Sequence, residues 1–217
     1  MYLENVVFDA VEPKRAGLFW EAVVGGERLT DEPEGFETRL EVEGGPTLDL
    51  CFQRVADPST DPPRLRLALS GEAGPAEGGA DPEGNPCPVV EDAAAYPDAG
   101  PLAALRLASA DPGRDAAFWS WLTGWVPVGG VAPRSLRHPS QRGAVLELWP
   151  EDGPKGTAKN RIHLDVRLEA GEDPDEVEAG VTSRGGLRMH VDWGELPWRS
   201  YTDPSGNEFC VLPARPS

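Results

Sequence analysis

Short apolar runs separated by glycine- and proline-rich turns dominate the chain, and few segments have the spacing of a helix. Strands are expected at 102–107, 144–149, 162–168, 187–191, 198–201 and 208–212, with weaker ones at 126–131 and 135–139. Helices are expected at 111–122, with Asp111 as N-cap and Pro112 at the first position, and at 173–183, which begins at Pro174. From residue 102 onward the predicted order is β-α-β-β-β, followed by β-α-β-β-β.

Three ordered matches show that the chain repeats itself. Residues 12–20, EPKRAGLFW, match residues 111–119, DPGRDAAFW, at an offset of 99. Residues 64–67, RLRL, match 161–164, RIHL, at an offset of 97, and 81–85, DPEGN, match 203–207, DPSGN, at an offset of 122. An apolar run before each Phe-Trp pair predicts a strand, a proline-containing turn and a helix in both copies.

The two copies differ in length between the second and third matches. Thirteen residues separate Leu67 from Asp81, whereas 38 separate Leu164 from Asp203. The first copy therefore lacks about 25 residues, the length of a helix and two strands, and its residues 70–80 are too rich in Gly, Ala, Glu and Pro to bury a face. We divide the chain into a shortened copy at 1–90, a linker at 91–100 and a complete copy at 101–217.

Composition and charge restrict the partners. Lys and Arg number 20 against 37 Asp and Glu, a net charge of −17, which repels nucleic acid and anionic membranes. This charge favours a cationic ligand, although solubility alone accounts for it equally well. The three cysteines are widely spaced and form neither a disulfide framework nor a structural zinc motif. With no targeting leader and no apolar run of about 20 residues, we expect a cytoplasmic protein.

Two segments of the second copy are distinctive: residues 159–166, KNRIHLDV, and residues 201–212, YTDPSGNEFCVL. The first resembles the strand that opens a second module, and the second resembles the closing turn and strand, of the glyoxalase-like and bleomycin-resistance-like domains of the vicinal-oxygen-chelate superfamily. The resemblance is strong over 101–213 and weaker over 3–90. It implies an α+β fold of tandem βαβββ modules whose curled mixed sheets form half-open cups, with the first copy truncated.

Members of that superfamily often hold a divalent metal in the cup, with ligands from the first and last strands of each module. By position, the resemblance places Ala104, Glu147, His163 and Cys210 there. Ala104 has no donor atom, so Glu147, His163 and Cys210 remain, a set that suits zinc better than magnesium. Because the usual ligand set is broken, we expect no cofactor. The alternative is a zinc, iron or manganese ion on these three residues.

A further set of side chains is expected to bind a ligand in the cup: His163, His190, Trp121, Trp149 and Trp198. His163 alternates with Asp165 on a strand predicted to face the cup, whereas His190 faces away if 187, 189 and 191 point to the core. Trp121 does not share the helical face of Trp119. Core packing remains the alternative for each tryptophan, as a hydrogen-bonding role does for His163.

Three functions remain open. The first is metal-free binding of a small molecule, drug-like or cationic and aromatic, which agrees with the tryptophans and the negative charge. The second is a metal-dependent lyase, isomerase or dioxygenase, in which Glu147, His163 and Cys210 hold an ion that polarises a substrate oxygen. The third is a structural role in which the truncated copy is a lid. We predict the first, with the second as alternative, in a monomer or homodimer.

Overall fold

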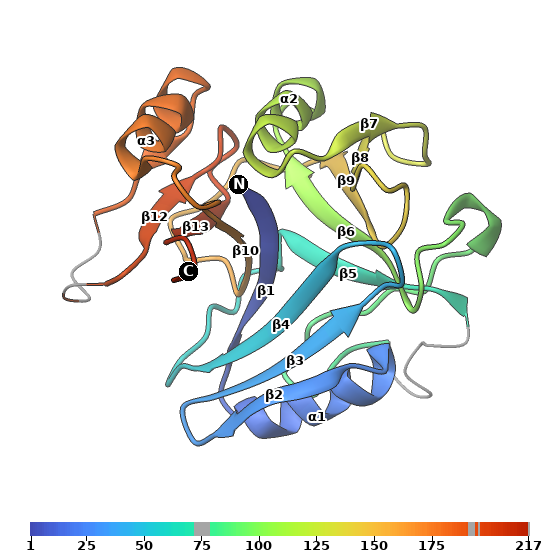
Figure 1. Ribbon diagram of the computed structural model, residues 1–217. Helices are drawn as coiled ribbons and strands as arrows, with labels where there is room; N and C mark the ends of the chain where they lie inside the picture. Colours follow the sequence, from blue (N-terminus) through green and yellow to red (C-terminus); the bar gives the residue numbers. More distant parts are fainter. Residues whose placement is uncertain (72–78, 191–193, 195, 217) are drawn as a thin grey trace.

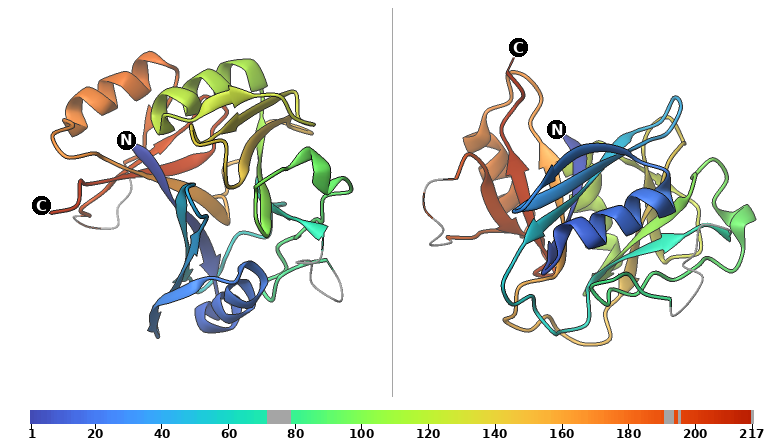
Figure 2. Two further views of the ribbon diagram at one scale, coloured as in Figure 1. Left: turned by 45° about the vertical axis from the view of Figure 1, so that its right-hand side comes forward. Right: turned by 90° about the horizontal axis from the view of Figure 1, so that it is seen from below.

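The computed structural model describes residues 1–71, 79–190, 194 and 196–216, which form two mixed sheets and three α-helices (Figure 1). The helices are α1 (Pro13–Val24), α2 (Pro112–Thr123) and α3 (Pro174–Ser183). Figures 1 and 2 show α2 and α3 near each other at one end of the molecule and α1 at the opposite end. No helix within the described residues is long and apolar enough to span a bilayer.

The larger sheet has eight strands in the order β11-β12-β13-β10-β1-β4-β3-β2. Its strands from the start of the chain are β1 (Tyr2–Ala10), β2 (Glu27–Glu32), β3 (Gly35–Glu41) and β4 (Thr47–Arg54). Those from the end of the chain are β10 (Ile162–Arg167), β11 (Leu187–Arg188), β12 (Arg199–Thr202) and β13 (Glu208–Leu212). The two groups join through the antiparallel pair of β1 and β10.

The smaller sheet has five strands in the order β5-β6-β9-β8-β7. These are β5 (Leu65–Leu69), β6 (Leu102–Ser109), β7 (Val126–Val128), β8 (Arg134–Arg137) and β9 (Val145–Pro150). The antiparallel pair of β5 and β6 joins the two sequence copies here, as β1 and β10 do in the larger sheet. The strands of the first copy therefore pair with the second copy in both sheets, a point that the sequence left open.

The predicted β-α-β-β-β order of residues 102–212 is confirmed, with strand ends displaced by a few residues. The side chain of Asp111 caps α2 by accepting from the backbone N–H groups of Gly113 and Arg114, each over 3.0 Å. Gly124 ends the helix in the left-handed region, at φ 71°, which favours glycine. Part of the expected strand at 187–191 and of the turn-rich segment 70–80 lies outside the described residues.

The matching turns at 81–85 and 203–207 each bind the tryptophan of their own copy's helix. Trp20 Nε1 donates to Asp81 Oδ2, and Trp119 Nε1 donates to Asp203 Oδ2, both over 3.1 Å. All four side chains are at most 5% exposed. Each copy thus ties its own turn to its own helix, while the sheets tie one copy to the other.

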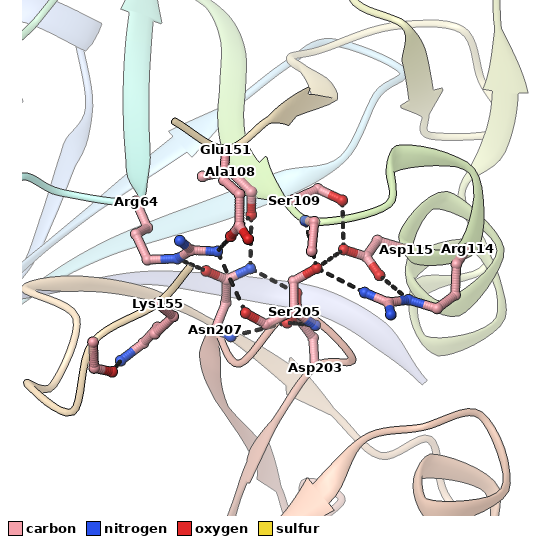
Figure 3. Close-up of polar contacts among 12 residues, drawn as sticks. Arg64, Ala108, Ser109, Arg114, Asp115, Glu151, Lys155, Asp203, Ser205 and Asn207 are labelled. Carbon is pink, nitrogen blue, oxygen red and sulfur yellow. Dashed lines mark hydrogen bonds and ion pairs between the residues drawn. The ribbon is translucent and has the colours of Figure 1, made fainter. Parts of the chain in front are cut away.

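In the second turn a polar network extends from Asp203 (Figure 3). Asn207 donates from Nδ2 to Asp203 Oδ2 over 2.9 Å and also to the Ala108 carbonyl over 2.9 Å. Ser205 Oγ donates to Asp115 of α2 and accepts from the Ala110 N–H over 2.8 Å. The network joins the turn before β13, a strand of the larger sheet, to β6 of the smaller sheet and to α2. It therefore fixes the two sheets against each other.

Candidate functional site

A cavity of about 850 Å³ lies over one face of the larger sheet. Strands from both copies supply its lining, with Val7 on β1, Cys51 on β4, His163 on β10 and Cys210 on β13. The curled sheet of the expected cup is therefore present, and the first copy forms half of it.

Strand register brings two rows of side chains together on this face. In one row Glu37 lies opposite Cys51, Cys51 opposite Val7, and Val7 opposite His163. In the next row Asn5 lies opposite Asp165, which lies opposite Cys210. Cross-strand partners share a face, so these residues make up the floor of the cup.

Three possible metal ligands meet on this floor. The donor atoms of His163, Asp165 and Cys210 all lie within 4.8 Å of one another. The imidazole Nε2 of His163 is 3.4 Å from Oδ1 of Asp165. His163 Nδ1 and Asp165 Oδ1 are buried and have no hydrogen-bond partner in the described part of the chain. Because leaving such groups unpaired costs free energy, the floor is suited to a polar ligand.

Burial shifts the pKa of each group towards its neutral form. Removal from water lowers the pKa of His163 to about 3, and the nearby charge of Lys159 lowers it further. Burial raises the pKa of Asp165 to about 7, although hydrogen bonds from Asn5 and Cys210 oppose the shift. Burial, with the nearby Asp165 charge, raises the pKa of Cys210 to about 12. Near neutral pH the floor therefore holds a neutral imidazole, a thiol and a partly ionised carboxyl group.

A second carboxylate, that of Glu37, lies across the floor. Its Oε1 accepts from the Cys51 thiol over 3.3 Å, and its Oε2 accepts from the Thr30 hydroxyl over 3.4 Å. Burial raises the pKa of the Cys51 thiol well above its usual value, and Glu37 adds to the effect. Among the described residues, neither Glu37 nor Asp165 forms an ion pair with a lysine or an arginine.

Known proteins share the sequence pattern and the fold of this chain. A family model for the glyoxalase-like domain matches residues 5–78 and 104–212. The chain belongs to the glyoxalase-like domain family. The resemblance found in the sequence, and the α+β fold that it implied, are thereby confirmed.

Solved structures show the same fold at low sequence identity. A glyoxalase I mutant from Zea mays is 16% identical, with a TM-score of 0.64, over 98% of this chain and 93% of that one. A putative dioxygenase from Bacillus subtilis is 16% identical, with a TM-score of 0.63, over 100% and 86%. The cppA protein from Streptococcus pneumoniae is 13% identical, with a TM-score of 0.52, over 99% and 98%. No curated protein matches the chain.

Of the residues expected to bind ligand or metal, the glyoxalase-like fold brings His163, Cys210 and Trp198 to the cup. His190 is exposed and does not line the cavity. Trp121 lies between α2 and α3, with the Arg184 guanidinium 4.1 Å from its ring centre. The helix–helix contact gives Trp121 a packing role.

Glu147 and Trp149 lie on β9 in the smaller sheet, away from His163 and Cys210. Glu147 is fully buried, and its carboxylate accepts from Tyr96 Oη over 2.7 Å, Trp149 Nε1 over 2.9 Å and Arg106 Nε over 3.0 Å. Tyr96 belongs to the predicted linker and shares an apolar cluster with Ala103 and Val145 of the smaller sheet. Glu147 thus bonds to protein groups of the linker and the smaller sheet and lies apart from the floor of the cup.

Only part of the rest of the floor could be predicted from the sequence. Asp165 follows His163 by two residues on a strand, and that spacing alone places both on one face. Glu37 and Cys51 belong to the first copy, and only the pairing of β1 with β10 brings them near His163. A repeat pattern does not specify which copy a strand pairs with.

Proposed function

We propose that this glyoxalase-like protein binds a small organic molecule in the cup and that Glu37 and Asp165 recognise a basic group on it. The observation that carries the proposal is a cavity of about 850 Å³ whose floor holds two carboxylates that pair with no lysine or arginine among the described residues. The two cations among the described lining residues already have partners. Lys159 Nζ lies 2.6 Å from Asp9 Oδ1, and Arg54 Nε lies 3.7 Å from Glu34 Oε1.

Burial makes the floor favour a positive charge. Removal from water raises the pKa of Asp165 to about 7, which means that the folded protein stabilises the ionised carboxylate less well than water does. A cation within about 4–6 Å stabilises that form and lowers the pKa again, so part of the binding free energy comes from Asp165 itself. The net charge of −17 adds an attraction for cations at longer range.

Apolar side chains above the floor suit the body of such a ligand. Four of them line the same cavity: Met189, Leu196, Trp198 and Leu212. Trp198 is partly buried there, so its ring is available for stacking or for a cation–π contact, worth about 0.5–2 kcal/mol. An aromatic or aliphatic ammonium compound satisfies both the floor and the walls.

Calorimetric titration with benzyltrimethylammonium tests this, beside 2,2-dimethyl-3-phenylpropan-1-ol, a neutral compound of similar shape. We expect the cation to bind at least tenfold more tightly, and Glu37→Gln and Asp165→Asn each to reduce that preference. Glu91→Gln, which removes an exposed carboxylate that does not line the cavity, is the matched control. Equal affinity for both compounds, or no binding of either at millimolar concentration, contradicts the proposal.

A metal-dependent activity is the second candidate, and the cluster of His163, Asp165 and Cys210 favours it. The donor types are those of zinc sites, and the unpartnered His163 Nδ1 and Asp165 Oδ1 are consistent with a missing polar partner. An ion held there would polarise a substrate oxygen. However, ligand atoms around tetrahedral zinc lie about 3.3–3.8 Å apart, so the donors, spread over as much as 4.8 Å, would have to move closer. Elemental analysis of untagged protein and of His163→Ala separates the two candidate functions. Stoichiometric metal that is lost in His163→Ala supports the metal-dependent activity, and metal-free protein supports the binding of an organic cation.

A further inference from the structure

A second, smaller cavity has the opposite electrostatic character. It has a volume of about 240 Å³ and lies where the segments 59–66 and 151–161 meet beside Ala108. Five cationic side chains line it: Arg64, Arg66, Lys155, Lys159 and Arg161. The chain carries a net charge of −17 and has only three lysines, two of which are here. We call this cavity the basic pocket.

Three of these cations hold the pocket walls together. Arg64 pairs with Glu151 over 2.6 Å, and Lys155 pairs with Glu208 over 2.9 Å. Lys159 pairs with Asp9 over 2.6 Å. Figure 3 shows Arg64 between Glu151 and Asn207, with Lys155 nearby. Their charges are therefore already balanced by the protein.

Arg66 and Arg161 differ, because neither forms an ion pair with any described residue. Arg161 donates from Nη2 to the Glu83 carbonyl over 2.6 Å, which fixes one end of its guanidinium. Its Nε is buried and has no hydrogen-bond partner among the residues that the structure describes, so this donor group is unpaired there. A charged donor left unpaired in this way is costly, and a planar guanidinium donates well to two oxygens of one anion.

The carboxylates in the lining do not neutralise these two arginines. Glu151 accepts from Arg64, and Asp61 and Asp152 are exposed side chains that solvent can hydrate. The basic pocket therefore presents two guanidinium groups that no carboxylate of its lining pairs with, around a partly enclosed space.

We propose that the basic pocket binds a small oxyanion, a phosphate or carboxylate group, through Arg161 and Arg66. Ser59, Ala158 and Lys159 line both this pocket and the cup. Two sources therefore share the chemistry: a free anion, or the acidic group of a molecule whose body lies in the cup. The site itself does not depend on what the cup binds.

Calorimetric titration with inorganic phosphate tests the site, at an ionic strength held constant with potassium chloride. We expect saturable binding, weakened at least tenfold by Arg161→Gln, or about 1.4 kcal/mol. Arg66→Gln, on an exposed side chain, is expected to weaken it several-fold without disturbing the fold. Arg15→Gln, an exposed side chain of α1, is the matched control and should change the affinity less than twofold.

No saturable binding of phosphate, or the same affinity in Arg66→Gln and Arg161→Gln as in Arg15→Gln, overturns the proposal. Asp165→Asn is expected to weaken binding of benzyltrimethylammonium in the cup and to leave the affinity for phosphate unchanged. A failure of the cup proposal is therefore distinguishable from a failure of the phosphate proposal. The 4-carboxy derivative of benzyltrimethylammonium separates the two sources. Competition with phosphate identifies the acidic end of a cup ligand, and simultaneous binding identifies a free anion.

Discussion

Changing Tyr96 to Phe removes one oxygen from the linker that covers the smaller sheet. That hydroxyl donates to Oε1 of Glu147 over 2.7 Å, and Glu147 has no exposed surface. The other donors, Arg106 Nε and Trp149 Nε1, both reach Oε2, so Oε1 loses its protein donor. A hydrogen bond to a buried charged group contributes about 1.5–3 kcal/mol. We expect Tyr96→Phe to lower the free energy of unfolding by that amount.

Urea unfolding followed by circular dichroism measures this difference, provided that the m value stays the same. Tyr2→Phe is the matched control, because its hydroxyl lies 3.5 Å from Glu4 Oε1 at a partly exposed position. The control should change the stability by less than about 0.5 kcal/mol. If Tyr96→Phe is as stable as the control, the linker does not hold Glu147 in the way described.

Three further predictions concern the core and the cup floor. Trp20→Phe and Trp119→Phe should each lower the free energy of unfolding in urea by about 1–3 kcal/mol, because each removes a 3.1 Å hydrogen bond to a buried carboxylate. Very different losses for the two variants would contradict the equivalence of the two turns. Burial raises the pKa of Asp165 to about 7, so the stability it contributes is full below about pH 4 and is lost as the pH rises to 7. Asp165→Asn should therefore gain melting temperature relative to the original protein between pH 5 and pH 8, and an equal difference at both pH values would count against that shift. Gly17→Ala would place a Cβ 2.0 Å from Phe36, an overlap expected to cost at least about 1–3 kcal/mol in the same unfolding assay, and a neutral result would show that α1 is not packed so closely.

Local patterns were sufficient to predict most elements of the fold. The Asp-Pro start of α2, the glycine that ends it and the alternation in β10 are properties of short segments, so the sequence contains them directly. The repeat of the Asp-Pro-x-Gly-Asn turn was also readable, and the structure supplies its reason: Asp81 and Asp203 each accept the indole N–H of a buried tryptophan.

The features that could not be predicted depend on pairing between strands that are far apart in the sequence. Glu147 lies on the last strand of one module and His163 on the first strand of the next, and they lie in different sheets because each module pairs with a partner from the other copy. The division at 1–90, 91–100 and 101–217 remains a prediction about the repeat, since both sheets contain strands of both copies. Glu37 and Cys51 joined the floor through that pairing. Trp121 does not line the cup but packs beside Gly180 of α3.

The central claim is that the carboxylates of the cup floor recognise a positive charge on an organic ligand. A crystal structure of the complex with benzyltrimethylammonium tests it most directly. We predict the ammonium nitrogen within about 6 Å of the carboxylates of Asp165 and Glu37, with the ring beside Trp198. A ligand bound outside the cup, or a metal ion on His163, Asp165 and Cys210 in its place, would contradict the account.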